Sequence, residues 1–504
     1  MDKNIDAAGN FDNLQTVEEE FLEESAGGKK EPGGRTPRKA NLMEALFTFG
    51  FLIVVMSVSI IKFKLDPHIP MFVGVIVAAI MGLWLGYKWE SLENAMIKGI
   101  SQAMQSIIIL AIIGMLIGVW IVSGVVPSMI LYGLKLLSPQ LFLPAAVLIC
   151  SITSLATGTS WGTAGTMGVA LMGIAVGLDI PLPLAAGAVI SGAYFGDKMS
   201  PLSDTTNLAP AMAGTDVFTH VKAMIPTTVV AYLAALGLFA YMGMGYGGTE
   251  TSLESIKLIQ DGILSQFKVS PVLLIPPALV IVLVAMKMPA IPGIVIGLLT
   301  AAALAPVYQG ASLGDILKCA HYGYVSETGV EVIDTLFTKG GLEGMLFSIS
   351  LTIIAMMFGG IMEETGQLET IVNAVLFRLR SYAGLIISTE ATCLFSNITM
   401  PEQYISIVVP GRMYAQAYRE KGLHPSQLSS TLEGMGTVSG ALIPWNTCGA
   451  FMANALGVPT AVYFKYCFFN LLMPLVVAAM AILKINIRRL TEEEKVKLAE
   501  TGRC

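Results

Sequence analysis

The chain has 504 residues, of which 54% are hydrophobic and only 13% are charged. Soluble globular domains carry about 25% charged residues, so the composition excludes an ordinary soluble protein. The mean hydropathy is +0.70, and many segments are long enough to cross roughly 30 Å of hydrocarbon as helices. We therefore expect an all-α polytopic membrane protein whose main partner is the lipid bilayer. The formal net charge of −6 gives no indication of a nucleic-acid partner.

The first 41 residues are polar and contain no apolar core. They pass from an acidic stretch at 18–24 to a basic stretch at 29–39. Such a composition is typical of disorder, so we expect 1–41 to be a disordered cytoplasmic tail, with a short helix within 15–24. We expect no cleavable signal peptide, because the tail lacks an apolar segment.

The remaining chain divides into two transmembrane repeats and their connections. We expect the first repeat at 42–243, connecting helices and loops at 244–341, the second repeat at 342–485 and a cytoplasmic tail at 486–504. Uninterrupted apolar spans are predicted at 45–61, 69–87, 103–123, 220–243, 271–287, 291–308, 342–362 and 463–485. Amphipathic helices at the membrane interface are predicted at 90–102, 126–137 and 368–380. Polar, extracytoplasmic segments are predicted at 244–270 and 309–341.

Each repeat also contains two apolar segments with polar interruptions. In the first repeat we predict a re-entrant hairpin at 140–178 and a broken helix at 181–214. In the second we predict a hairpin at 381–420 and a broken helix at 429–456. Non-helical backbone at membrane depth is tolerated only where protein or a water-filled cavity satisfies it. The free helix ends at such breaks can bind ions.

The two interrupted regions align without gaps at an offset of 242 residues. Asp204 and Thr205 then fall on Asn446 and Thr447. An odd number of crossings separates the two repeat starts, which predicts inverted repeats, and the total is even. Basic residues before the first span and after the last predict that both termini are cytoplasmic and that the chain lies in the cell (inner) membrane.

Two carboxylates in the first broken helix are the leading candidates for ion coupling. A charge inside the bilayer costs several kcal/mol and is functional by default. Asp197 and Asp204 are seven residues apart, which places them on one helix face if the break is short. We favour Asp204, because Asp197 has an alternative role in an ion pair with Lys198. A carboxylate here can ligate Na⁺, carry a proton, or do both in turn.

Hydroxyl and amide groups surround the breaks and supply the oxygen ligands that hard cations prefer. An alternative role is helix capping. The candidates are Thr157, Thr159, Ser160, Ser203, Thr205, Thr206 and Asn207 in the first repeat, and Ser396, Asn397, Thr399, Asn446 and Thr447 in the second. For Na⁺ itself we hypothesise ligation by Asp204, Thr157, Asn397 and Asn446. No cofactor is expected beyond the transported or coupling ions Na⁺ and H⁺.

Three glutamates lie in apolar surroundings of the second repeat. We favour Glu402, which follows the hairpin tip, over Glu390 and Glu433. Glu433 falls opposite Ser191 and so breaks the repeat symmetry. Trp161, beside the first tip, can pack either on a substrate or on a neighbouring helix.

No cysteine or histidine spacing indicates a metal site. The six cysteines are expected to be free thiols, because none forms a CxxC pair and most lie in apolar segments. No recognisable nucleophile–base set indicates an enzyme.

Two segments resemble the NhaC family of Na⁺/H⁺ antiporters: GAYFGDKMSPLSDTTNLAP at 192–210 and the tip ATGTSWGT at 156–163. The resemblance extends over roughly 42–485. It implies inverted repeats with two re-entrant hairpins and two broken helices, an elevator-type movement and a homodimer. A serine–asparagine–threonine signature of related symporters is matched only in part, by Ser396-Asn397-Ile398-Thr399.

The resemblance implies Na⁺/H⁺ antiport. An alternative within the same fold is a Na⁺- or H⁺-coupled transporter or exchanger of a small organic acid, such as malate or lactate, or of an amino acid. No arginine lies at either tip, which favours a small substrate or ions alone. A channel or a membrane-embedded enzyme is a remote alternative, because paired and interrupted segments suit alternating access.

Overall fold

The computed structural model describes residues 37–246, 250–286, 288–376, 381–400 and 402–495. The short helix predicted within 15–24, and most of the two tails, lie outside the described residues. Within them the secondary structure is helical apart from two isolated β-bridges. The prediction of an all-helical, multi-pass membrane protein is confirmed.

Six helical segments are long and apolar enough to cross a membrane, or up to eight spans if each of two bent helix pairs is one span. These counts refer to the described part of the chain. The six segments are Leu42–Ile60 (α2 with η1), Met104–Val122 (α5), Pro139–Thr157 (α7), Val217–Gly243 (α12), Ile291–Gln309 (within α15, Ala290–Gln309) and Gly341–Glu364 (α18). Shorter helices are α3 (His68–Trp84), α4 (Trp89–Gln102), α6 (Val125–Leu136) and α19 (Gln367–Leu376).

The segments predicted as polar connections contain helices. These are α13 (Glu250–Gln266), α16 (Leu313–Tyr322) and α17 (Glu331–Phe337). Helix α16 begins with a capping box between Ser312 and Asp315, which satisfies its first backbone N–H groups. Capping and packing thus stabilise helices that hydropathy alone does not indicate.

Both bent pairs occur at the edges of predicted spans. Ile256–Gln266 and Pro271–Val284, which includes η3 (Pro271–Leu274) and most of α14 (Ile275–Ala285), meet at 101°. Thr460–Tyr466 (α24 with η6) and Phe468–Ile482 (α25) meet at 56°. The span predicted at 463–485 is therefore bent near its start, because Cys467 has non-helical backbone angles of −76° and 66°.

The first interrupted region has two breaks. Helix α7 ends at Thr157, Gly158 adopts a left-handed φ of 68°, and α8 (Ser160–Thr163) continues through η2 (Ala164–Gly168) into α9 (Val169–Gly177). Thr159 caps α8 by accepting a hydrogen bond from the Gly162 N–H. The second break separates α10 (Leu182–Met199) from α11 (Asp204–Ala213), where Pro201 has no N–H to continue the helix.

The second interrupted region follows the same order of elements. Helices α20 (Tyr382–Thr399) and α21 (Ile405–Glu420) are followed by α22 (Pro425–Leu432) with η4 (Glu433–Thr437). A short turn, η5 (Gly440–Leu442), then leads to α23 (Thr447–Leu456). Asn446 caps α23, because its side chain accepts a hydrogen bond from the Cys448 N–H.

Helix starts recur at nearly constant spacing between the two regions. Helices α6 and α19 begin 242 residues apart, and α11 and α23 begin 243 apart. Gly124 is the residue directly before α6, and Gly366 is the residue directly before α19. Both have left-handed backbone, with φ of 83° and 66°. The element order is therefore repeated, while the inverted orientation of the repeats stays a prediction.

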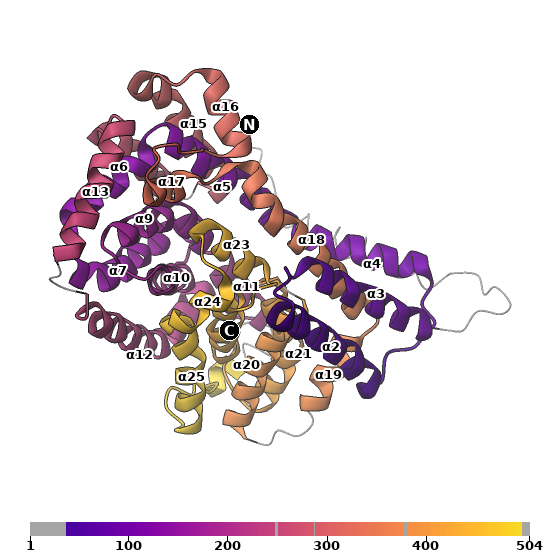
Figure 1. The fold of residues 1–504 in the computed structure, drawn as a ribbon. Coiled ribbons are helices and arrows are strands. Elements are labelled where there is room, and N and C mark those ends of the chain that lie inside the picture. Colours follow the sequence, from indigo (N-terminus) through magenta and orange to yellow (C-terminus); the bar gives the residue numbers. More distant parts are fainter. Residues whose placement is uncertain (1–36, 247–249, 287, 377–380, 401, 496–504) are drawn as a thin grey trace, which may run out of the picture.

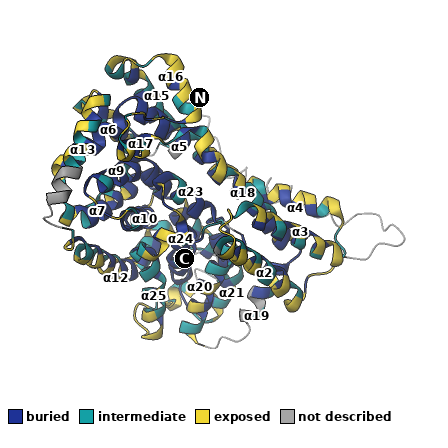
Figure 2. Ribbon diagram, in the orientation of Figure 1, coloured by how far each residue is buried: buried dark blue, intermediate teal, exposed yellow. Residues whose placement is uncertain are grey.

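The two regions pack together at the centre of the molecule (Figure 1). Helices α3 and α4 pack along α18 at one side, with α2 against α3, whereas α13, α15 and α16 lie towards another side. Burial is highest around α9, α10 and α23, and the outer helices expose many large apolar side chains (Figure 2). That distribution suits a protein surrounded by lipid.

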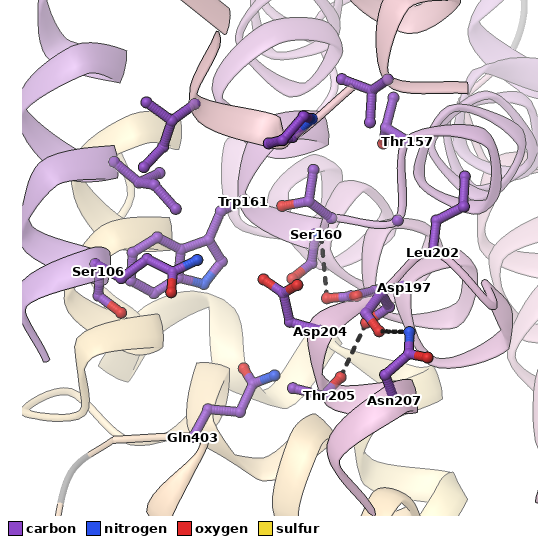
Figure 3. A pocket seen from close by; sticks show the side chains of 18 of the residues that line it. Ser106, Thr157, Ser160, Trp161, Asp197, Leu202, Asp204, Thr205, Asn207 and Gln403 are labelled. Atoms are coloured by element: carbon purple, nitrogen blue, oxygen red, sulfur yellow. Dashed lines mark hydrogen bonds between the residues drawn. The ribbon is translucent and has the colours of Figure 1, made fainter. Parts of the chain in front are cut away.

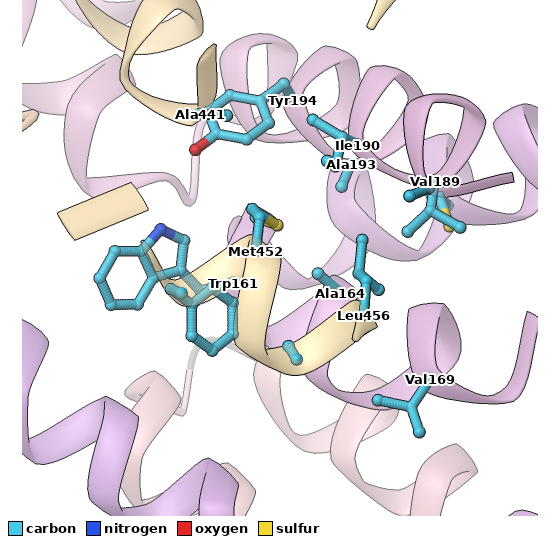
Figure 4. Close-up of a cluster of buried hydrophobic side chains, with 14 of the residues drawn as sticks. Trp161, Ala164, Val169, Val189, Ile190, Ala193, Tyr194, Ala441, Met452 and Leu456 are labelled. Carbon is cyan, nitrogen blue, oxygen red and sulfur yellow. The ribbon is translucent and has the colours of Figure 1, made fainter. Parts of the chain in front are cut away.

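One apolar cluster joins the two regions directly. The short helix α23 packs against α8, α9 and η2. Met452 and Leu456 of α23 lie among Trp161, Ala164 and Val189 (Figure 4). The first tip is consequently held against the helix that follows the second break.

Candidate functional site

A cavity of about 700 Å³ lies where the two interrupted regions meet. Its lining comes from α5, the first tip, the first break, the segment between α14 and α15, and the loop before α21. Polar residues that line it include Ser106, Thr157, Asp197, Asp204 and Gln403 (Figure 3). Glu402 lines it as well. The cavity thus collects side chains that are more than 290 residues apart in the sequence.

Asp197 is the carboxylate that connects the first tip to the first broken helix. Its side chain is buried, with 5% of the residue exposed, and lies near the C-terminal end of α10. The backbone N–H of Ser160, the first residue of α8, donates to Asp197 Oδ2 at 3.1 Å. A free N–H at a helix start stabilises negative charge, so this geometry suits an ionised carboxylate.

The side chains of Thr206 and Asn207 form hydrogen bonds with backbone carbonyl oxygens at the first break. Thr206 Oγ1 lies 3.1 Å from the carbonyl oxygens of both Asp197 and Lys198, where α10 ends. Asn207 Nδ2 donates to the carbonyl oxygens of Pro201 at 2.9 Å and Ser203 at 2.7 Å. These bonds satisfy backbone groups that the interrupted helix leaves free.

Asp204 is exposed and faces the cavity (Figure 3). It is the first residue of α11, and Tyr404 donates a long hydrogen bond of 3.4 Å to its Oδ2. The neighbouring hydroxyls of Ser203 and Thr205 are 3.1 Å apart. Thr205 Oγ1 also donates to Glu433 Oε1 at 2.9 Å, so the first break contacts the second region.

The two asparagines of the second region bind each other. Asn446 Nδ2 donates to the carbonyl oxygen and to Oδ1 of Asn397, each at 3.0 Å. Asn397 Nδ2 in turn donates to the Gly436 carbonyl oxygen at 2.7 Å and to Ser439 Oγ at 2.9 Å. Neither asparagine lines the cavity, so they are not brought together with Asp204 and Thr157.

Several other predicted residues carry buried oxygens without a hydrogen-bond partner among the described residues. Thr157 Oγ1 and Glu402 Oε2 belong to cavity-lining residues. Ser396 Oγ and Thr447 Oγ1 lie in the second region. Thr399 instead donates to the Phe395 carbonyl oxygen at 2.8 Å. Thr157 and Glu402 therefore bring to the cavity lining oxygens that accept or donate no hydrogen bond within the described chain.

Trp161 packs on a neighbouring helix. Its ring stacks on Phe451 of α23, with centroids 4.6 Å apart and planes inclined by 12°. It also borders the cavity. The residue therefore anchors the first tip while closing one wall of the cavity.

The structure gives Glu433 and Lys198 surroundings that the sequence alone does not indicate. Glu433 is fully buried and contacts Thr205 across 228 residues of sequence. Lys198 is also fully buried, and no ion pair with Asp197 is found within the described residues. A charged residue inside an apolar helix was the only sequence signal for either. Glu433 lies opposite Ser191 in the repeat alignment, and its contact with Thr205 has no symmetric counterpart in that pair.

No group of three or more His, Cys, Asp or Glu side chains among the described residues is arranged to hold a metal ion. The cavity oxygens come instead from carboxylate, hydroxyl and amide groups, which are ligands of hard cations.

Residues 192–485 match the model of the Na⁺/H⁺ antiporter family. The chain is 39% identical over 451 residues to the Na⁺/H⁺ antiporter NhaC of Alkalihalophilus pseudofirmus, covering 89% of this chain and 97% of that one. It is 40% identical over 430 residues to the malate-2H⁺/Na⁺-lactate antiporter of Bacillus subtilis, covering 85% and 92%. It is 36% identical over 446 residues to the arginine/ornithine antiporter ArcD of Halobacterium salinarum, covering 88% and 92%.

Among solved structures, MtrF of Neisseria gonorrhoeae aligns with 86% of this chain and 98% of its own, at 14% identity and a TM-score of 0.41. That likeness is too distant to carry an argument.

Proposed function

We propose that this chain exchanges Na⁺ for H⁺ across the cell membrane. It belongs to the NhaC family of Na⁺/H⁺ antiporters and is therefore a secondary transporter rather than an enzyme. The observation that carries the proposal is the buried Asp197 carboxylate, which lies on the cavity wall and accepts the Ser160 N–H at 3.1 Å. A charge in the membrane interior costs free energy, so a buried carboxylate on a cavity wall is a candidate for a functional group.

In this proposal Na⁺ binds at the Asp197 carboxylate. Thr157 Oγ1 and Glu402 Oε2, which have no hydrogen-bond partner among the described residues, complete the site, and Asp204 attracts cations at the exposed part of the cavity wall. The two hydrogen bonds that Asn446 donates to Asn397 hold the second tip against the second break, outside the cavity lining. Na⁺ binding requires the carboxylate to be ionised, so protons and Na⁺ oppose each other at the site.

The proposed mechanism uses two inverted repeats. The hairpins at 140–178 and 381–420 enter and leave on the same side. The break near 200–203 lines the cavity, and the helix that follows the second break reaches the cavity through Cys448. The body that carries the cavity moves like an elevator within a homodimer. Both termini are cytoplasmic. The repeated element order supports this arrangement, and breaks at a repeat interface are typical of secondary transporters.

Proteoliposomes containing the full chain test the proposal. An imposed Na⁺ gradient should move H⁺ in the opposite direction with no organic solute present. Asp197→Asn should abolish this coupling, because the amide cannot carry the charge that holds Na⁺. Asp179→Asn is the matched control, since Asp179 is exposed between α9 and α10 and has a left-handed φ that asparagine tolerates. Normal exchange by Asp197→Asn would contradict the proposed site.

A second candidate is exchange of a small organic acid or amino acid together with the ions. The cavity of about 700 Å³ is far larger than one Na⁺ needs and lies within the roughly 300–1,000 Å³ typical of ligand pockets. A relative named as a malate-2H⁺/Na⁺-lactate antiporter is 40% identical. If H⁺ moves only after malate, lactate, arginine or ornithine is added to the same proteoliposomes, this candidate replaces plain antiport.

A further inference from the structure

We propose that the cavity also binds a small aliphatic diamine, a dication without a carboxylate, in competition with Na⁺. One ammonium group binds at Asp197, where Na⁺ binds, and the other binds at Asp204. The inference rests on the proposed function, because it names the class of organic substrate that the same site selects.

Acidic residues from three separate segments line the cavity. Asp197 lies near the end of α10, Asp204 begins α11, and Glu402 lies in the loop before α21. Figure 3 shows Asp197 and Asp204 on the same part of the wall. Among the described residues, no lysine, arginine or histidine lines the cavity. A monovalent ion balances the charge of one carboxylate, whereas a diamine balances two.

The basic residue next to Asp197 in the chain does not offset this acidic wall. Lys198 is 0% exposed and does not line the cavity. Its Nζ donates to the sulfur of Met224 on α12 at 3.1 Å. Within the described chain it forms no ion pair with Asp197. A substrate ammonium group at Asp197 therefore meets no competing ion pair there.

The helix starts beside the cavity are already partnered by the protein's own side chains. The Ser160 N–H, at the start of α8, donates to Asp197 Oδ2 at 3.1 Å. Asp204 is itself the first residue of α11. The Cys448 N–H, near the start of α23, donates to Asn446 Oδ1 at 3.0 Å. Helix starts attract anions, but here acidic and amide groups of the chain already use them. A substrate carboxylate would add negative charge to an acidic wall.

Two buried oxygens in the lining indicate a ligand that is positively charged or donates hydrogen bonds. Thr157 Oγ1 and Glu402 Oε2 have no hydrogen-bond partner among the described residues. The two residues are 6% and 1% exposed, and buried polar atoms are normally paired. An ammonium group has three donors and no acceptor, so it suits such oxygens. Na⁺ uses the same oxygens in the proposed function, so the two cations exclude each other.

The cavity has room and apolar surface for the chain between two ammonium groups. Its volume is about 700 Å³. Trp161 lines it and is held in place by its ring, which stacks on Phe451 with centroids 4.6 Å apart. Leu202, Ile291 and Pro292 also line it. A methylene chain gains apolar contact with this surface, which a metal ion cannot.

Four compounds that share a four-carbon chain but differ at its ends test the proposal. Putrescine, butylamine, γ-aminobutyrate and succinate compete with radiolabelled Na⁺ for the purified full-length protein at constant ionic strength. We expect putrescine to be about fivefold more potent than butylamine, which is the size of one ion pair at an exposed site. γ-Aminobutyrate should be weaker than butylamine, because its carboxylate approaches Asp204, and succinate should not displace Na⁺.

Asp204→Asn tests the position of the second ammonium group. Butylamine should still displace Na⁺ at Asp197, which also shows that the variant is folded. The advantage of putrescine over butylamine should fall to about twofold, the statistical benefit of two equivalent ends. Asp179→Asn makes the same substitution at an exposed site between α9 and α10 and should keep the wild-type ratio.

Three results would contradict the proposal. Succinate that displaces Na⁺ better than putrescine would make the cavity a site for anions. Wild-type protein on which putrescine has no more than the statistical advantage would remove the second ammonium site. Bound radiolabelled putrescine that Na⁺ cannot displace would overturn the shared site. In each case, Na⁺-driven H⁺ movement in wild-type proteoliposomes would still support the proposed function, whereas its absence together with the loss of Na⁺ binding would overturn both.

Discussion

At the scale of single residues, Asn446, which the sequence offers as a Na⁺ ligand or a helix cap, does cap α23. It accepts the Cys448 N–H at 3.0 Å and donates twice to Asn397. We expect Asn446→Ala to lower the unfolding free energy by about 1–2 kcal/mol, as for other lost caps, and to leave Na⁺ affinity unchanged. Asn446→Ser should recover part of the stability, because serine caps α23 without reaching Asn397. Thermal unfolding in detergent measures the change in stability, and a Na⁺-binding assay measures the affinity. Weaker Na⁺ binding by folded Asn446→Ala would show that Asn446 contributes to the ion site.

A second residue-scale prediction concerns Asp334, which lies outside the membrane-spanning segments. Its carboxylate accepts the Thr328 N–H and hydroxyl, each at 2.7 Å, and the Gly329 N–H at 2.9 Å. The backbone bond from Thr328, followed by its hydroxyl, holds the pKa of Asp334 below the usual value of about 3.9. The stabilisation is therefore complete above that usual value and is lost as pH falls through the lowered pKa.

We expect Asp334→Asn to lower the Tm at neutral pH and to raise hydrogen exchange at the amides of Thr328 and Gly329. The difference from wild type should shrink in acid, where the wild-type carboxyl is also neutral. Glu331→Gln is the control, because Glu331 is an exposed acid on the same short helix. An Asp334→Asn effect that is constant down to strong acid would show that the charge of Asp334 contributes nothing.

At the scale of elements, the left-handed glycines before α6 and α19 should tolerate alanine unequally. A non-glycine residue at positive φ costs roughly 1–2 kcal/mol at either site. At Gly124, a Cβ would also lie 2.3 Å from Gln309 Nε2, which binds the Ser123 and Lys268 carbonyl oxygens. At Gly366 the nearest atom is 3.3 Å away, on the flexible side chain of Lys39.

We therefore expect Gly124→Ala to lower the Tm more than Gly366→Ala does. Thermal unfolding of the two variants in the same detergent measures the difference. Equal losses would mean that the backbone conformation alone sets the cost and that the Gln309 contacts add nothing. The comparison is internally matched, because the same substitution is made at corresponding positions of the two repeats.

The sequence predicts helices better than it predicts side-chain positions. Apolar spans such as α5 and α18 follow from hydropathy, because the bilayer requires long apolar helices. The relative burial of Asp197 and Asp204 does not follow. Their seven-residue spacing places them on one face only in a continuous helix, but non-helical Ser200 separates them and Asp204 starts α11. The contact between Glu433 and Thr205 does not follow from the sequence either, because the two residues lie in different repeats.

At the scale of the whole molecule, the cysteines allow the proposed topology to be tested. Cys150, Cys393, Cys448 and Cys467 are buried, whereas Cys319 is partly accessible on α16. The connection that contains α16 is predicted to be extracytoplasmic, and Cys504 ends the tail that is predicted to be cytoplasmic. A membrane-impermeant maleimide should therefore reach the two positions from opposite sides.

In right-side-out vesicles, we expect a Cys319→Ser, Lys318→Cys variant to be labelled at position 318, which is exposed on α16. In inside-out vesicles, we expect labelling at Cys504. A further Ser25→Cys change, with Cys504→Ser, should be labelled from the same side as Cys504, because an even number of crossings returns the chain to its starting side. Labelling of positions 25 and 504 from opposite sides would make the number of crossings odd. The count of crossings from which the inverted orientation of the repeats is predicted would then be wrong.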